Sequence, residues 1–377
     1  MRLLHTSDWH FGMPRGTDTY EADQRFFLQQ LYEIIASEHV DALLLAGDVY
    51  DSSVSNADAI RLYNDAMTRI CGEMHVPAVV IAGNHDSGAR LASCRDLLRG
   101  AGLYVTGRLE RNVEPVLLDG GRTAVYALPF FGRDEVAALF PEHRAQITSY
   151  EAAVRTVCDE IRAHMDADRC NILLAHAYVV GADLSESDRA ARVGQAIAVS
   201  AGVFDGFDYV ALGHIHKPQR ITETVRYSGS PIQYSFGAEE KQIKSVVLFD
   251  TDTRQVRQIP LRQLHPHRTL TGTFDEIMQT DDAHDAYLRV CLTDRYAGPE
   301  VLGELRERFP LLMELAGKST EQTGAASFLT TEQLRQMDET EIMRQFMREI
   351  CDAEPNERQL AMFRDALMQT QEEGDRG

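Results

Sequence analysis

Residues 40–51 read VDALLLAGDVYD, and residues 78–87 read AVVIAGNHDS. Each stretch begins with a short apolar run, of the kind that forms a strand buried on both faces, and then passes through a glycine into polar residues. The glycine lets the backbone turn sharply out of the strand. Open α/β sheets place their functional sites at the carboxyl ends of their strands. We therefore expect an α/β fold with a polar site beyond these two strands.

The same pattern extends over the first two-thirds of the chain. Similar apolar runs predict strands over residues 2–6, 123–128, 171–175 and 209–212. Amphipathic helices are expected between strands, over residues 21–37, 57–74 and 149–165. This alternation favours a layered α/β core. Residues 225–236 and 245–249 are expected to be strands with no helix between them, so the sheet should end antiparallel.

The pattern breaks near Pro260–Pro266, and a smaller α+β unit is expected after it. Strands are predicted over 268–274, 287–292 and 311–315, with a helix over 299–309. A polar linker and two helices, over 331–351 and 356–368, complete the chain. The apolar stripe of these helices fits either docking on their own domain or binding to a partner protein. The predicted domains are thus residues 1–265, 266–318 and 319–377.

Composition narrows the class of protein. The chain has 377 residues, and 38 basic against 58 acidic side chains give a net charge of −20, which argues against a broadly basic surface that grips nucleic acid. The six cysteines show no C-x-x-C spacing, so a zinc ribbon or a disulfide framework is not expected. Neither a signal-peptide pattern nor an apolar run of membrane-spanning length is seen. We therefore expect a cytoplasmic protein without a membrane partner.

Metal-ligand residue types follow five of the predicted strands. They are D-x-H at 8–10, G-D at 47–48, G-N-H-D at 83–86, His176, and G-H-x-H at 213–216. One such residue at a strand end is commonly a cap, but five groups at what we expect to be the same edge of one sheet predict a metal site. Aspartate, the Asn carbonyl and imidazole together suit Mn²⁺, Fe²⁺ or Zn²⁺. The set is large enough for two ions that share a ligand, an arrangement used for in-line displacement at phosphorus.

These motifs together resemble the calcineurin-like metallophosphoesterase superfamily. Within it, the chain is similar to the SbcD family of nuclease subunits, through the segments LLHTSDWHFG, AGDVYD, AGNHDS, LGHIHKPQ and YSGSPIQYSFGAEEKQIKSVVLFD. The resemblance is strong over residues 1–250. In the residues after 250 it lies mainly in the order of the predicted elements rather than in matching motifs. It implies a β-sandwich flanked by helices, followed by a small capping domain and partner-binding helices.

The resemblance also implies roles for individual residues. One metal ion would be held by Asp8, His10 and His216, the other by Asn84, His176 and His214, with Asp48 bridging them. His85 would stabilise developing charge or protonate the leaving oxygen, and Asp86 would orient His85. Asp51 stands where related nucleases often have a second catalytic histidine, which leaves its role open. Trp9 could stack on a base, although a lone aromatic beside a site is more often part of the packing.

The function implied by the resemblance is a Mn²⁺-dependent DNA nuclease for repair, recombination and replication. It would act as a 3′→5′ exonuclease on duplex ends and an endonuclease on single strands and hairpins, in a complex with the SbcC ATPase and as a homodimer. Residues 266–318 would position DNA, and the final helices would bind SbcC. Two alternatives remain open: a phosphomonoesterase or cyclic-nucleotide phosphodiesterase on the same core, and a scaffold without activity.

Overall fold

The structure is a computed structural model that describes residues 1–16, 18–188, 198–281, 283–317 and 360. Met1–Lys318 form one compact unit, and Ser319–Gly377 form a second. The predicted linker and the helices over 331–351 and 356–368 lie outside the described residues, apart from Leu360. Among the described residues, no helix is both long and apolar enough to cross a membrane.

A six-stranded sheet carries the first three metal-ligand motifs. Its strand order is β16-β15-β1-β4-β5-β6. The four strands β1 (Arg2–Thr6), β4 (Ala42–Leu45), β5 (Ala78–Ile81) and β6 (Leu103–Thr106) are parallel. At its other edge, β15 (Ser245–Asp250) and β16 (Val256–Pro260) are antiparallel. The expected antiparallel ending is therefore confirmed.

A second six-stranded sheet carries the remaining two motifs, in the order β13-β14-β12-β9-β8-β7. Its strands are β7 (Val116–Leu118), β8 (Thr123–Leu128), β9 (Cys170–His176), β12 (Tyr209–Gly213), β13 (Gln219–Arg220) and β14 (Val225–Tyr227). The expectation that all five motifs share one sheet is wrong. The central strands of both sheets are buried on both faces, and their sequences do not distinguish a covering helix from a covering sheet.

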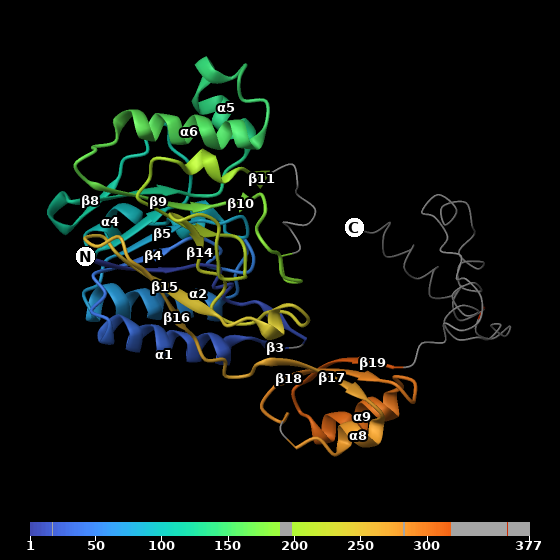
Figure 1. Ribbon diagram of the computed structural model, residues 1–377. Helices are drawn as coiled ribbons and strands as arrows, with labels where there is room; N and C mark the ends of the chain where they lie inside the picture. The colour runs from blue at the N-terminus through green and yellow to red at the C-terminus, as the bar shows by residue number, and fades with distance from the viewer. Residues whose placement is uncertain (17, 189–197, 282, 318–359, 361–377) are drawn as a thin grey trace, which may run out of the picture. The chain divides into compact units, whose positions relative to one another are not determined.

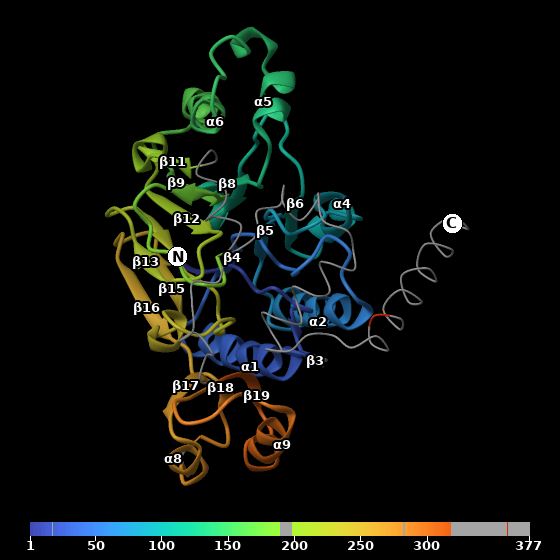
Figure 2. The same ribbon diagram turned by 90° about the vertical axis from the view of Figure 1, so that its right-hand side faces the viewer.

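The two sheets pack face to face, and helices cover their outer faces (Figures 1 and 2). Apolar side chains from both sheets, such as Leu44, Ile81, Ile172 and Leu174, form the core between them. On the outer faces, α1 (Glu21–Ser37) and α2 (Ala57–Met67) pack against the first sheet, and α6 (Tyr150–His164) packs against the second. This is the β-sandwich flanked by helices that the resemblance implied. Shorter elements are β2 (Pro14–Arg15), β3 (Asp18–Thr19), α3 (Gly88–Leu91), α4 (Arg95–Arg99), α5 (Arg133–Leu139), β10 (Tyr178–Val179) and β11 (Ala198–Val199).

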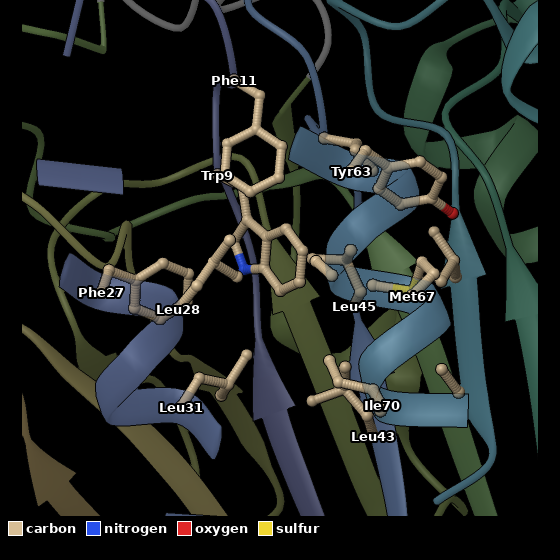
Figure 3. Packing of buried hydrophobic residues seen from close by; sticks show 14 of the residues in the cluster. Trp9, Phe11, Phe27, Leu28, Leu31, Leu43, Leu45, Tyr63, Met67 and Ile70 are labelled. Atoms are coloured by element: carbon tan, nitrogen blue, oxygen red, sulfur yellow. The ribbon is translucent and has the colours of Figure 1, made fainter. Parts of the chain in front are cut away.

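Trp9 belongs to the core under the first sheet. Its side chain is fully buried between the rings of Phe11 and Phe27, at centroid distances of 5.1 and 5.6 Å (Figure 3). Its Nε1 donates to the Thr6 hydroxyl at 3.0 Å. The packing interpretation is confirmed, and Trp9 is not available to stack on a base.

The predicted strand over 225–236 is mostly wrong, because β14 ends at Tyr227. The next residues, Ser228–Gly229–Ser230–Pro231, turn the chain beneath the G-H-x-H loop. Gly229 has a φ of 77°, and a Cβ there would lie 2.7 Å from the His216 carbonyl oxygen. The segment from 228 to 244 therefore packs against a predicted metal ligand, with only a short 3₁₀ turn at Glu239–Lys241.

A three-stranded parallel sheet follows, in the order β17-β18-β19. Its strands are β17 (His267–Gly272), β18 (Tyr287–Leu292) and β19 (Leu312–Ala316), with helices α8 (Phe274–Met278) and α9 (Pro299–Arg308). The five-residue α8 was missed because it is too short to show a helical period. This small sheet has an apolar core of its own. It contacts helix α1 through a hydrogen bond from the Tyr287 hydroxyl to Asp23 at 2.5 Å, and the Tyr287 side chain packs into the apolar core beneath the first sheet.

Candidate metal centre

The loops that carry the predicted ligands meet at the carboxyl ends of both central sheets. Backbone bonds join the first two loops, from the Asp8 amide to the Gly47 carbonyl and from the His10 amide to the Asp48 carbonyl, each at 3.0 Å. The two sheets come close together beside Gly213, where a Cβ would lie 1.9 Å from the Ala46 carbonyl oxygen. Glycine at this position lets a loop from the second sheet reach the loops of the first.

Four of the predicted ligands have left-handed backbone conformations. The φ angles are 53° at Asp8, 43° at His10, 46° at Asp48 and 101° at His214. A positive φ is uncommon for residues other than glycine, and it persists only where the surroundings enforce it. Such strain gathers at functional sites, so its concentration here supports a functional role for these loops.

The first group of donors consists of Asp8, His10 and His216. One ligand atom from each lies within 4.8 Å of the others, and all three residues are buried. The Nε2 atoms of His10 and His216 face each other at 3.1 Å. The Asp8 carboxylate is held by the backbone amide of His214, at 3.0 and 3.2 Å from its two oxygens.

The second group consists of His176, His214 and Asn84, with Asp48 beside them. The Asn84 Oδ1 lies 3.0 Å from His176 Nε2 and 2.8 Å from His214 Nδ1. His176 Nδ1 donates to the Ala46 carbonyl at 2.8 Å, which leaves Nε2 as the atom that faces the other donors. Imidazole nitrogen and amide oxygen thus converge on one point, as ligands of a transition metal do.

Asp48 lies between the two groups. Its Oδ2 is 3.7 Å from His10 Nε2 in the first group and 3.4 Å from His176 Nε2 in the second. Its other oxygen accepts from the His85 amide at 2.9 Å, which fixes the carboxylate in place. The structure therefore brings together all seven residues that the sequence singled out as ligands, and the Asp48 carboxylate lies between the two groups.

The donor set fits divalent cations. The Nε2 of His214 is buried without a hydrogen-bond partner. Burial alone would raise the pKa of Asp48, but the adjacent histidines hold that pKa well below its usual range. Burial would likewise lower the pKa of His176, yet Asp48 and Asp8 raise it to about 9. The buried carboxylates thus favour positive charge at this position, and a divalent cation would supply it in place of a proton.

His85 and Asp86 differ in what they contact. The His85 ring Nδ1 donates to the Asp51 carbonyl at 2.8 Å. The Asp86 carboxylate instead accepts backbone N–H groups of Gly83, Val49 and Tyr50, at 2.9–3.1 Å. The expectation that Asp86 orients the His85 ring is thus corrected: Asp86 ties two loops together, and the Asp51 carbonyl orients the ring. The Asp51 carboxylate lies 3.5 Å from His10 Nδ1.

Several residues around the centre were missed by the sequence reasoning. Asp188 accepts the backbone amide of His216 at 3.0 Å. Behind His216 lies a fully buried ion pair, in which Lys244 Nζ is 2.5 Å from Glu239 Oε1. Lys244 also donates to the His216 carbonyl at 2.9 Å. The sequence signal for this ion pair was the run AEEKQIK at residues 238–244. This run is part of the segments that carry the resemblance, but the sequence reasoning gave it no role.

The buried pair leads to a prediction about stability. Burial alone would raise the pKa of Glu239, but Lys244 lowers it from an ordinary 4.5 to about 2. Since the folded-state pKa lies below the unfolded-state value, the pair stabilises the fold above about pH 4.5, and this contribution is lost as pH falls towards 2. Glu239→Gln leaves a buried ammonium unpaired, so we expect the free energy of unfolding at pH 7 to fall by about 3–5 kcal/mol.

Urea unfolding of the wild type and the variant, followed by circular dichroism from pH 7 down to pH 4, measures this loss. The difference between the two proteins should shrink below pH 4.5, because the Glu239 carboxyl of the unfolded wild-type chain begins to take up a proton there while that of the folded protein stays ionised. Glu223→Gln is the control, since Glu223 pairs with Arg220 at 2.6 Å while its side chain is 81% exposed. We expect that variant to lose at most about 1 kcal/mol. Equal losses in the two variants would contradict the buried-pair argument.

Comparison with known proteins agrees with this geometry. The family model described as calcineurin-like phosphoesterase matches residues 1–218. A second model, described as the type 5 capsule protein repressor C-terminal domain, matches residues 260–350. The SbcD component of the nuclease SbcCD from Staphylococcus epidermidis is 28% identical over 359 residues, which cover 93% of this chain and 94% of that relative. The predicted resemblance is thereby confirmed.

Proposed function

Since the chain belongs to the calcineurin-like phosphoesterase family, we propose that it is a metal-dependent DNA nuclease, the counterpart of the SbcD component in an SbcCD complex. One observation carries the proposal. Seven donor residues from five loops converge into two groups, and the Asp48 carboxylate lies between them. Two ions sharing one carboxylate suit hydrolysis of a phosphodiester, because both the attacking and the leaving oxygen need positive charge beside them.

The proposed reaction assigns distinct tasks to the residues around the centre. The seven donors would hold two divalent ions, which supply Lewis-acid chemistry at phosphorus when they are bound. The Asp51 carbonyl holds the Nδ1–H of the His85 ring, which leaves Nε2 to face the substrate. In its doubly protonated, imidazolium form the ring would give its Nε2 proton to the leaving oxygen and remain as the neutral Nδ1–H imidazole. Asp86 keeps the loops of Asp48 and His85 in register through its bonds to backbone amides.

We also propose that Mn²⁺ is the cofactor. Mixed imidazole, amide and carboxylate donors favour Mn²⁺, Fe²⁺ or Zn²⁺ over Ca²⁺ or Mg²⁺, which prefer nearly all-oxygen sites. The expected activities are 3′→5′ exonuclease on duplex ends and endonuclease on single strands and hairpins, in DNA repair and recombination. The free thiols Cys71, Cys94, Cys158, Cys170 and Cys291 fit a reducing compartment, which supports a cytoplasmic location.

The proposed partners are DNA, an SbcC-type ATPase and a second copy of this chain. The net charge of −20 supports a division of labour, in which the nuclease subunit cuts and its partner supplies much of the DNA affinity. Residues 266–318 would cap the site and help to position DNA. The predicted helices within residues 319–377 would bind the ATPase.

Cleavage of DNA by the full chain tests the proposal. A labelled blunt duplex is incubated with the protein in Mn²⁺, in Mg²⁺ and in excess chelator, beside bis-p-nitrophenyl phosphate and p-nitrophenyl phosphate. We expect shortening of the duplex from its 3′ ends in Mn²⁺ and none in chelator. Rapid turnover of the monoester with intact DNA would instead identify a phosphomonoesterase. If no substrate is cleaved in any metal, the chain acts as a scaffold.

A further inference from the structure

A chain of buried hydrogen bonds leads away from the metal centre through His216. The ring Nδ1 of His216 lies 2.8 Å from the Ser187 hydroxyl oxygen. The same hydroxyl lies 2.9 Å from Glu239 Oε2, and Glu239 is fully buried. None of these contacts involves a metal-facing atom, so their effect on the centre is exerted through the His216 ring.

The hydroxyl has one proton, and the chemistry of its neighbours decides where that proton points. The pKa of Glu239 is held at about 2, so its carboxylate is ionised at neutral pH and can only accept. If Ser187 donated to His216, the Ser187 and Glu239 oxygens would face each other at 2.9 Å with no proton between them. Ser187 therefore donates to Glu239 and accepts from His216 Nδ1–H.

This direction fixes the state of the imidazole. With its proton on Nδ1, neutral His216 carries a lone pair on Nε2, the atom that faces His10 Nε2 at 3.1 Å. Metal-ligating histidines commonly donate their second N–H to a carboxylate or carbonyl, which orients the ring and makes the ligating nitrogen more basic. In this chain a serine is inserted between the imidazole and the carboxylate.

Lys244 completes the arrangement from the backbone side. Its ammonium group neutralises Glu239 and also donates to the His216 carbonyl at 2.9 Å. Ring and backbone of the same residue are therefore held by one buried ion pair. We propose that Ser187 and Glu239 are positioning residues that set the tautomer and ring orientation of His216, and so tune the affinity of one of the two metal sites. This inference rests on the proposed dimetal centre.

The chain offers a matched pair of substitutions. Ser187→Ala removes the hydroxyl that links the His216 ring to Glu239. This link from His216 through Ser187 to Glu239 is called the relay below. Ser235→Ala removes another hydroxyl that donates to the same Glu239 oxygen, at 2.6 Å, and leaves the bond between Ser187 and His216 in place. Ser187→Thr retains a hydroxyl and serves as the rescue. Titration of the metal-free full-length protein with Mn²⁺, followed by calorimetry, measures the affinity of each site without any need for turnover.

We expect Ser187→Ala to weaken one of two Mn²⁺-binding events about 10- to 100-fold and to leave the other unchanged. Ser235→Ala should bind both ions as the wild type does, and Ser187→Thr should recover most of the lost affinity. Wild-type affinity at both sites of Ser187→Ala, or an equal loss in Ser235→Ala, would overturn the relay. If the wild-type protein itself binds no Mn²⁺, the dimetal centre fails, which is a different result from failure of the relay.

Co²⁺ provides a second readout, because its visible absorption reports the ligand geometry at the occupied site. A purely structural role for Ser187 predicts the same spectrum at saturation in the wild type and in Ser187→Ala. A positioning role predicts a changed spectrum in Ser187→Ala that Ser187→Thr restores. Identical spectra in all of these proteins would also overturn the proposal.

Discussion

His85→Ala is expected to cleave duplex DNA about 10²- to 10⁴-fold more slowly than the wild type, the range that general acid catalysis contributes. The reason is the geometry of the ring, whose Nδ1 is fixed by the Asp51 carbonyl at 2.8 Å while its Nε2 is left for the substrate. Single-turnover cleavage of a labelled duplex in saturating Mn²⁺ measures the chemical step apart from product release.

The decisive feature of this variant is that metal binding survives. The contact between His85 and Asp48 runs through the His85 backbone amide at 2.9 Å, and alanine retains that amide. We therefore expect wild-type Mn²⁺ affinity in calorimetry. His164→Ala serves as the control, because His164 is an exposed residue at the end of α6. Full cleavage activity in His85→Ala would exclude the proposed proton transfer.

Asp48→Asn, unlike His85→Ala, is expected to lose metal binding and cleavage together. Groups that hydrogen-bond to a metal-ligating side chain contribute about 10- to 100-fold to metal affinity. The loss of a charged ligand shared by both sites should therefore lower the Mn²⁺ affinity by more than about 100-fold. Asparagine has nearly the same shape, and its carbonyl oxygen can still accept the His85 amide. The effect therefore comes from the lost charge and lost bridge rather than from a collapsed loop.

Calorimetric titration with Mn²⁺ and the duplex cleavage assay together measure this effect. Asp252→Asn is the matched control, since the Asp252 side chain is 68% exposed and pairs with the chain's own amino terminus. Circular dichroism checks that both variants are folded. Two ions bound by Asp48→Asn with wild-type affinity would contradict the bridging position.

The two variants separate binding from chemistry. In His85→Ala the ions stay and the reaction slows, whereas in Asp48→Asn the ions themselves are lost. A scaffold without activity would show neither effect on cleavage. A phosphomonoesterase would show both effects on the monoester and none on DNA.

Much of the site was predictable from the sequence because its signals are local. Helix α1 over Glu21–Ser37 and strand β1 over Arg2–Thr6 have the predicted bounds, since a helical or strand period is a property of neighbouring residues. Each ligand motif likewise ends or follows its own strand. The ligand types could therefore be identified without knowledge of which strands are neighbours.

Other features were decided only by tertiary structure. A strand that is buried on both faces has the same kind of sequence whether a helix or a second sheet covers it. The division of the motifs between two sheets was therefore not visible in the sequence. The partner of the His85 ring is the carbonyl of Asp51, 34 positions away, and a backbone carbonyl leaves no mark in a sequence. The same holds for Ser187, whose hydroxyl meets the ring of His216, 29 positions further along the chain.

The sequence by itself thus determined the donor residues and the strands that carry them. The tertiary structure decided how those donors divide into two groups, why Asp48 lies between them, and which buried side chains hold them. The physical reason is range: hydrophobic period and turn chemistry act over a few residues, whereas hydrogen bonds and ion pairs depend on distances in space. The pair of Lys244 and Glu239 is an example, because its two residues are near neighbours in the chain, yet its role comes from contact with His216, 28 positions from Lys244.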